Sequence, residues 1–398
     1  MNEVYRKYLA ALRSFVSNTD PENVGQEEWR ELMELAHINN TVGIVSFVYM
    51  HHPAQAPSGV CPELRKACLG GIALYAQRAE AMRKLAVEFD KNGIDCIFFK
   101  GFVVRDYYPV PELRTFGDVD FVVRKEDRVK SDELMKALGY EPKDTWEPAY
   151  SYLKGTEYYE IHTDVMEIDV SDQADYVDYY RHIWDHVQPA RVVQLKHALE
   201  FTPEFHFLYM LTHIAKHLVS AGAGIRMYLD VAAFIRHRKD APDWAWIRRE
   251  LETLRLWPFA NGVLTLVQRC FGVESPLELD PMEETTWDAF LEFTMAGGIF
   301  GQVGRDSGTN SLKNQSRGSE GISRVGTFMK RLFPSAKSIQ SRYTYLQDKP
   351  WLLPAAWVHR LVKTRDTWQR HAREAQNILS ADLTEVQKIK DLYDQLGL

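Results

Sequence analysis

The chain has 398 residues, of which 45% are hydrophobic and 26% charged, a balance typical of water-soluble globular proteins. A formal net charge of −7 excludes an overall positive field that would attract the chain to nucleic acid or anionic lipid. The N-terminus lacks the apolar core of a signal peptide, and we find no apolar run of about eighteen residues. We therefore expect a cytoplasmic protein without a membrane span.

Composition and periodicity divide the chain into three regions, which together predict an α+β protein. Residues 1–71 are typical of helices separated by turn-rich breaks, residues 72–190 of a mixed unit of strands and helices, and residues 191–398 of a helical domain. Residues 301–321 are rich in Gly, Ser and Asn, which predicts a long mobile loop within the last region.

An amphipathic helix followed by an apolar strand opens the central region. The apolar face of this helix carries Leu74, Met82, Leu85, Ala86 and Phe89, and Gly93 is the expected C-cap. The strand that follows, residues 94–99, ends in Lys100 and Gly101. Gly101 permits close approach of the backbone to a ligand, and Lys100 supplies a positive charge for phosphate.

Asp118 and Asp120 stand at the head of the next apolar strand, one residue apart. Side chains alternate along a strand, so the two carboxylates point the same way, about 7 Å apart, and repel each other. A divalent cation relieves this repulsion at the mouth of a buried strand, and hard oxygen ligands suit Mg²⁺ or Mn²⁺. The alternative is a strand-entry turn with two solvated acids. Gly117 leaves room for the approach to Asp118.

Downstream, residues 126–138 are predicted to form a helix, and residues 166–170 alternate as a strand does. In that strand Glu167 and Asp169 would share one face and place a third carboxylate beside the first pair. Residues 158–162 could form the other half of a hairpin with it.

The ordered set of Lys100-Gly101, Arg114 and the Asp118-Val119-Asp120 triplet resembles the nucleotidyltransferase fold of the polymerase-beta-like superfamily. Within it, the chain is similar to an uncharacterised bacterial group that has Lys-Gly where most members have Gly-Gly or Gly-Ser. The resemblance is strongest over residues 70–235 and implies that residues 72–190 are a catalytic domain.

The resemblance implies a role for each matching residue. Asp118, Asp120 and Glu167 would be catalytic and hold the metal ions, with Asp169 as the alternative third acid. Lys100, Gly101, Arg114 and Gly117 would contact a nucleoside triphosphate such as ATP. The plainer alternative makes Lys100 an exposed strand-end lysine and pairs Arg114 with Glu112 or Asp118.

The helical region adds His213 and His217, four residues apart on one helical face, and Asp230 in an otherwise apolar helix. Ile214 stands where the zinc-protease motif requires Glu, so we interpret the two histidines as structural or as lining a cleft. We expect Asp230 to be a buried partner for one of these polar groups.

These observations predict a Mg²⁺- or Mn²⁺-dependent enzyme that moves a nucleoside monophosphate from a nucleoside triphosphate to a non-templated acceptor, by two-metal in-line displacement. The acceptor would be a small molecule or a protein hydroxyl, and the acidic composition argues against nucleic acid. A silent nucleotide- or partner-binding module on the same fold is the main alternative. A metal-dependent glycosyltransferase would need a βαβ series before the acid pair, which the helical first region does not supply.

Overall fold

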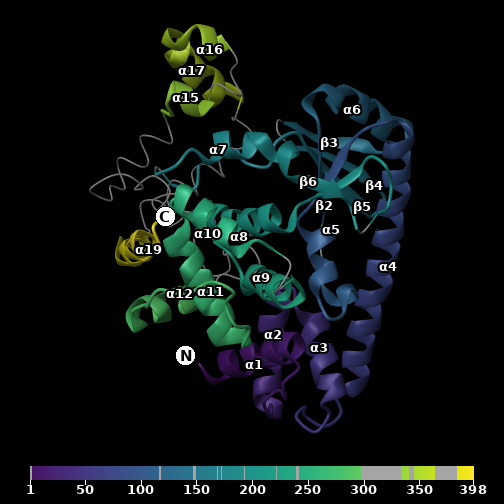
Figure 1. Cartoon of the computed structure of the whole chain (residues 1–398), viewed down its shortest axis with the longest axis vertical. Coiled ribbons are helices and arrows are strands. Elements are labelled where there is room, and N and C mark those ends of the chain that lie inside the picture. Colours follow the sequence, from purple (N-terminus) through teal and green to yellow (C-terminus); the bar gives the residue numbers. More distant parts are fainter. Residues whose placement is uncertain are drawn as a thin grey trace.

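The computed structural model combines one mixed sheet with a large helical region (Figure 1). It describes residues 2–115, 118–146, 149–167, 169–171, 173–191, 193–220, 222–238, 242–296, 333–339, 345–363 and 383–398. The predicted loop at 301–321 and the predicted ligand residue Gly117 lie outside these ranges. None of the described helices combines the length and apolar character needed to cross a membrane.

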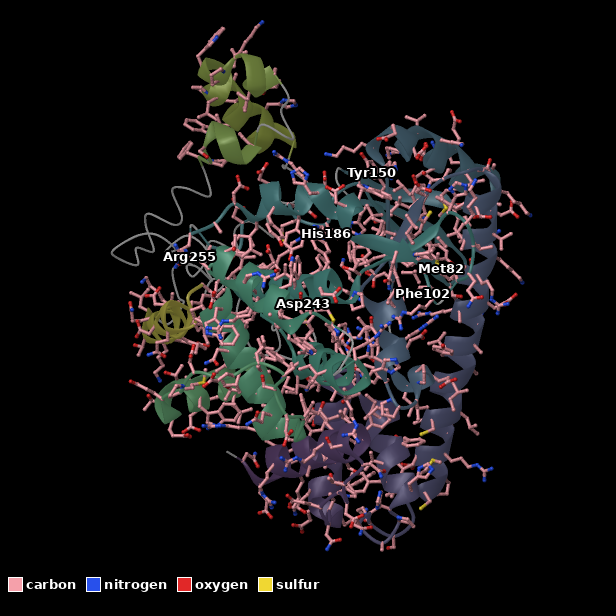
Figure 2. The ribbon with its side chains drawn as sticks, in the orientation of Figure 1. Met82, Phe102, Tyr150, His186, Asp243 and Arg255 are labelled. Carbon is pink, nitrogen blue, oxygen red and sulfur yellow. The ribbon has the colours of Figure 1, made fainter. Side chains whose placement is uncertain are left out.

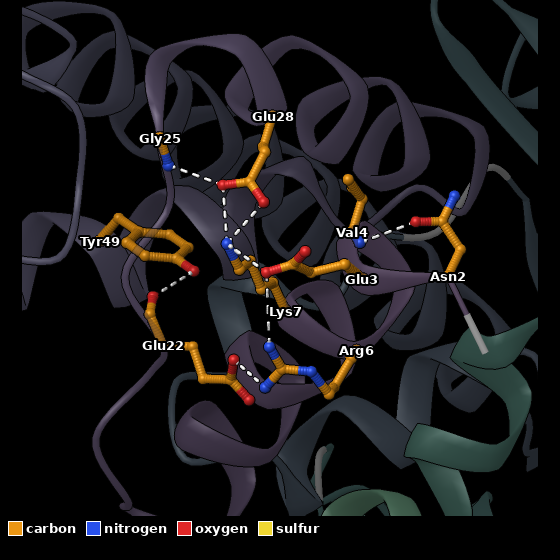
Figure 3. Close-up of polar contacts among 9 residues, drawn as sticks. All are labelled: Asn2, Glu3, Val4, Arg6, Lys7, Glu22, Gly25, Glu28 and Tyr49. Carbon is orange, nitrogen blue, oxygen red and sulfur yellow. Dashed lines mark hydrogen bonds and ion pairs between the residues drawn. The ribbon is translucent and has the colours of Figure 1, made fainter.

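The first residues form three helices, α1 (Glu3–Ser17), α2 (Gln26–Ile38) and α3 (Val42–His51). Figure 3 shows the charged contacts that join α1 to α2. Lys7 Nζ lies 2.7 Å from Glu28 Oε2, and the Gly25 N–H donates a hydrogen bond to the same oxygen at 2.9 Å. This carboxylate therefore caps α2 and anchors α1 at once.

The long helix α4 (Cys61–Lys91) runs along one side of the molecule, from the N-terminal helices to the sheet (Figure 1). Its second half is amphipathic as predicted, and Phe89 packs edge-on against Phe121 of the sheet with ring centroids 5.3 Å apart. Leu74 was predicted on the same buried face, but its side chain is 42% exposed. Here the prediction was wrong, because the first half of α4 projects past the sheet that buries the second half.

The seven strands have the order β3-β4-β5-β2-β1-β7-β6, with the acid-bearing β2 at the centre. Their bounds are β1 Cys96–Phe98, β2 Val119–Val123, β3 Glu141–Trp146, β4 Ala149–Lys154, β5 Glu157–His162, β6 Val187–Pro189 and β7 Ala198–Phe201. Strand β2 pairs antiparallel with β1 and parallel with β5. The parallel register sets Asp120 opposite Glu160.

The remaining elements are mainly helical, and side chains such as Met82 of α4 and Phe102 of α5 fill the interior between them (Figure 2). They are α5 Gly101–Val104, η1 Arg105–Tyr107, η2 Pro111–Leu113, η3 Lys125–Asp127, α6 Arg128–Ala137, α7 Tyr176–Tyr179, η4 Tyr180–His186, α8 Pro203–Ser220, α9 Ile225–Arg238, α10 Trp244–Thr253, α11 Trp257–Phe271, α12 Glu284–Ala296, α15 Ala336–Ile339, α16 Tyr345–Asp348, η5 Pro350–Leu352, α17 Leu353–Lys363 and α19 Leu383–Gln395. The sheet flanked by these helices confirms the α+β class.

One hydrophobic core continues from α1 through the sheet to α19, whereas Leu346 and Ala356 form a separate small core within α15–α17. The proposed division at residues 71 and 190 stays a prediction.

In the segment predicted as a strand, residues 166–167 and 169–170 are described and are irregular, so this prediction was wrong. The physical reason is the sheet itself: β5 already has β2 on one edge and β4 on the other. The alternation arises because Met166 and Val170 are buried in the core. Asp169 contacts the start of α7 instead. Its Oδ1 accepts hydrogen bonds from the backbone N–H groups of Tyr176 and Val177, at 2.9 and 3.1 Å.

Candidate active site

A cavity of about 270 Å³ opens between the sheet and the helices α8 and α9. Its walls combine acidic side chains from the sheet with basic and imidazole side chains from the opposite elements. They are Lys100, Gly101, Val104, Arg114, Asp118, Asp120, Glu160, Tyr209, Met210, His213, Ile214, His217, Arg226, Met227 and Asp230. Most of the residues singled out from the sequence therefore meet in one place.

Three carboxylates form the acidic wall. Asp118 and Asp120 come from the head of β2 and both line the cavity, as the strand alternation predicted. Glu160 comes from the neighbouring strand β5, where the register sets it beside Asp120. Burial, reinforced by Asp120 and Asp118, raises the pKa of Glu160 to about 7. Burial and the charge of Asp120 likewise raise the pKa of Asp118.

The side chains of Asp120, Glu160 and His162 form a compact group of metal-ligating atoms, all within 4.8 Å of one another. Alternation along β5 places Glu160 and His162 on the same face. His162 Nε2 lies 2.8 Å from Asp120 Oδ1 and 3.7 Å from Glu160 Oε2. Neither β5 residue was singled out from the sequence. The alternation of Tyr158–His162 indicated a strand there, but it did not indicate that this strand pairs with β2.

Lys100 lies at the turn between β1 and α5 and reaches into the acidic group. Its Nζ is 2.8 Å from Asp120 Oδ1, the oxygen that also contacts His162. Burial opposes ionisation of Asp120, but the Lys100 charge and the His162 contact outweigh it and hold the Asp120 pKa below its usual range. The same pairing outweighs burial of Lys100 and raises the pKa of its ammonium group.

Arg114 forms a buried ion pair with Asp230. Its Nε and Nη2 donate to the two oxygens of Asp230 at 3.1 and 2.7 Å, and the Tyr108 hydroxyl donates to Asp230 Oδ1 at 2.6 Å. The expected partners Glu112 and Asp118 do not form this pair, and Asp230 serves Arg114 rather than a histidine. Contact of Arg114 with a triphosphate stays a prediction that competes with this pairing.

Arg226, in the first turn of α9, was not singled out from the sequence. Its Nη1 donates to the Thr115 carbonyl at 2.6 Å, while its buried Nε has no hydrogen-bond partner among the described residues. Burial, with the nearby charge of Arg114, lowers the pKa of this guanidinium. An arginine short of negative charge in the wall of a cavity is suited to an anionic ligand.

Two of the predicted ligands lie apart from this group. Glu167 is exposed, and its carboxylate is 3.7 Å from Lys216 Nζ. Asp169 is also exposed and accepts the α7 N–H groups described above. Neither lines the cavity. The structure brings Glu160 to the position that the sequence analysis assigned to one of them.

His213 and His217 line the cavity from α8, with their Nε2 atoms 3.2 Å apart. Burial lowers the pKa of His217 to about 4 and holds that of His213 well below its usual value, in each case with help from neighbouring positive charges. Both rings are therefore neutral at pH 7 and add hydrogen-bonding capacity without charge.

The donor set fits a hard divalent cation. Carboxylate oxygens are the preferred ligands of Mg²⁺ and Mn²⁺, and one imidazole is compatible with Mn²⁺. Burial and the neighbouring carboxylates raise the pKa values of Asp118 and Glu160, and a cation bound between them would favour their ionised forms. Carboxylates on adjacent strands facing basic side chains define a class of site used for metal-assisted phosphoryl chemistry.

Comparison with known proteins identifies the family of the chain. A family described as "Uncharacterised nucleotidyltransferase" matches residues 25–272, more than half of the chain, and the chain belongs to this family. The resemblance drawn from the motifs is thereby confirmed. Among solved structures, that of the antibiotic-resistance factor ANT(2'')-Ia aligns with 46% of this chain and 90% of its own, at 11% identity and a TM-score of 0.32. No curated protein matches the chain.

Proposed function

We propose that the protein transfers a nucleoside monophosphate from a nucleoside triphosphate to a hydroxyl of a non-templated acceptor, with Mg²⁺ or Mn²⁺. One observation carries the proposal: Asp118, Asp120 and Glu160 meet in a cavity whose other walls provide Lys100 and Arg226. Family membership supplies the reaction class. The positions of the side chains in the cavity support the choice of the residues that would carry out this reaction.

Asp118, Asp120 and Glu160 would hold the divalent metal, with His162 beside them. In-line displacement at phosphorus builds charge on the attacking and leaving oxygens, and two cations about 3.5–4 Å apart can stabilise both ends. Bound metal supplies this stabilisation and lowers the pKa of the acceptor hydroxyl. The acidic wall therefore aligns the α-phosphate, and the basic wall receives the remaining phosphates.

The transfer forms one bond and breaks one. The acceptor oxygen bonds to the α-phosphorus, and the bond from that phosphorus to the bridging oxygen breaks, so that pyrophosphate leaves with the electron pair. The acceptor proton needs a base within reach, and we assign this role to Glu160. It faces the cavity beside Asp120, as Glu167 and Asp169 do not, so a hydroxyl bound there lies within its reach.

Arg226 would bind the β- or γ-phosphate, because Arg114 is already neutralised by Asp230. We expect Arg226→Gln to weaken triphosphate binding by about ten- to a hundred-fold, the value of one charge-assisted hydrogen bond. Titration calorimetry with tripolyphosphate measures this directly. Arg236→Gln, at the exposed far end of the same helix, is the matched control and should leave binding unchanged. Equal losses in both variants would show a general charge effect instead.

The acceptor we propose is a small molecule or a protein hydroxyl. A net charge of −7 works against the long anionic backbone of a nucleic acid, whose binding depends on released counterions. The cavity of about 270 Å³ is of a size for a nucleotide phosphate tail and a single acceptor group.

Thermal unfolding tests the donor site. ATP, GTP, CTP and UTP are each added with Mg²⁺ to the wild type and to the double variant Asp118→Asn, Asp120→Asn. A ligand at a hundred times its dissociation constant adds about 2.7 kcal/mol of apparent stability. We expect a metal-dependent shift with at least one triphosphate in the wild type and none in the variant.

The double variant Glu283→Gln, Asp288→Asn removes two exposed acids elsewhere and should keep the shift. If no triphosphate stabilises the wild type, a preformed donor site is ruled out, and a partner-binding module on this fold becomes the better account.

A further inference from the structure

Lys100 has a backbone conformation that is unfavourable for any residue other than glycine. Its φ of 52° and ψ of −138° lie in a region that glycine adopts readily and other residues avoid. A lysine nevertheless occupies this turn. Its side chain is 22% exposed and is directed at the side chain of Asp120, which is 8% exposed. Strain of this kind persists where the surrounding structure holds it, which is characteristic of functional sites.

The ammonium group takes an oxygen that a second metal ion would need. Two ions about 3.5–4 Å apart are close enough to share a bridging carboxylate. Asp120 is the central acid of the group, and its Oδ1 is in contact with both Lys100 Nζ and His162 Nε2, each at 2.8 Å. This oxygen has no lone pair left for a metal ion while Lys100 stays in place.

In the cavity without nucleotide, the formal charges favour one divalent ion. Asp118, Asp120 and Glu160 contribute three negative charges to the cavity when all are ionised. One divalent ion together with the Lys100 ammonium group cancels them. Two divalent ions with Lys100 would leave a positive excess in the nucleotide-free cavity, next to Arg226, whose buried Nε has no hydrogen-bond partner among the described residues.

We propose that Lys100 is the second cation of the active site, so that each bound nucleotide is accompanied by one divalent ion. The inference rests on the proposed function and deepens it. In the transfer, Lys100 would stabilise charge on the phosphoryl oxygens at one end of the displacement, and the ion held by Asp118 and Glu160 would act at the other.

Equilibrium dialysis against Mn²⁺ and a mixture of the four α,β-methylene nucleoside triphosphates tests the inference. Free ion and free complex equalise across the membrane, so the excess on the protein side counts bound Mn²⁺ per bound nucleotide. We expect one ion in the wild type and two in Lys100→Gly, which removes the charge and suits the backbone of this turn. Electron paramagnetic resonance should show isolated Mn²⁺ in the wild type and a spin-coupled pair in the variant.

Two further variants keep the test decisive. Lys100→Met retains the length of the side chain without its charge and should also admit a second ion, even if the glycine variant folds poorly. Lys136→Met removes an exposed lysine paired with Asp132 at 2.7 Å on α6 and should keep one ion.

Two ions per nucleotide in the wild type, or one ion in both Lys100 variants, would overturn the role of Lys100 and leave the proposed function intact. If the wild type binds no analogue, the proposed function fails and this inference fails with it.

Discussion

Glu160→Gln is expected to slow nucleotidyl transfer by about 10²- to 10⁴-fold, the usual contribution of a general base. The loss arises because Glu160 is paired in register with Asp120, lines the cavity and has its pKa raised to about 7 by burial and by its acidic neighbours. The glutamine keeps the size of the side chain but cannot take a proton. The rate is measured as pyrophosphate release from the triphosphate that stabilises the protein, with water as acceptor if no better one is known.

Glu167→Gln is the matched control, because it makes the same chemical change in the residue that the sequence analysis favoured. Glu167 is exposed, and its contact with Lys216 at 3.7 Å is worth little in solvent. We expect its rate to stay within about five-fold of the wild type, since such contacts contribute under 1 kcal/mol. A larger loss in Glu167→Gln than in Glu160→Gln would restore the original assignment and refute ours.

Mn²⁺ affinity provides a readout that does not depend on the acceptor. Removal of one ligand of a hard cation weakens binding, so Glu160→Gln should bind Mn²⁺ less tightly, by at least about ten-fold. Glu167→Gln and Asp169→Asn should match the wild type. Unchanged affinity in Glu160→Gln would limit Glu160 to proton transfer.

The parts of the site that could be predicted from the sequence depend on residues that lie close together in the chain. Alternation along one strand was enough to place Asp118 and Asp120 on the same wall, and helical spacing was enough to predict α8 and α9. The turn at Lys100 and Gly101 follows a strand of apolar residues, and it lies at the cavity as expected. Each of these inferences needs only the periods of regular structure.

The third acid could not be found in this way, because its position depends on strand pairing. Glu160 meets Asp120 only through the parallel register of β2 and β5, which joins residues 40 positions apart. Two segments alternated, 158–162 and 166–170, and local pattern could not decide which one joins the sheet. One edge of β2 is paired with β1, so one strand can pair with its other edge, and that strand is β5.

The basic wall shows the same limit. Arg114 and Arg226 are both arginines near the cavity, and nothing local distinguishes them. Their roles diverge because Asp230 on α9 reaches Arg114 and neutralises it, whereas Arg226 donates to the carbonyl of Thr115. A charge partner 116 residues away is set by helix packing, not by sequence pattern.

Asp230→Asn is expected to lower the free energy of unfolding by about 3–5 kcal/mol, because it leaves the buried Arg114 charge unpaired. The Arg114 and Asp230 side chains are 7% and 11% exposed and share a bidentate contact, and the Tyr108 hydroxyl loses its charged acceptor as well. Urea denaturation measures the loss. Glu252→Gln, which breaks the more exposed 2.7 Å pair with Arg248 on α10, should cost less than about 1 kcal/mol.

The double variant Arg114→Met, Asp230→Leu separates structure from binding. Replacing both members of a buried pair by apolar groups removes the unpaired charge, so much of the lost stability should return. If Arg114 is purely structural, this stable double variant still binds tripolyphosphate as the wild type does, while Arg226→Gln does not. If the double variant folds but loses the anion, Arg114 contacts phosphate as the sequence first suggested, and Asp230 is the partner it exchanges for the ligand.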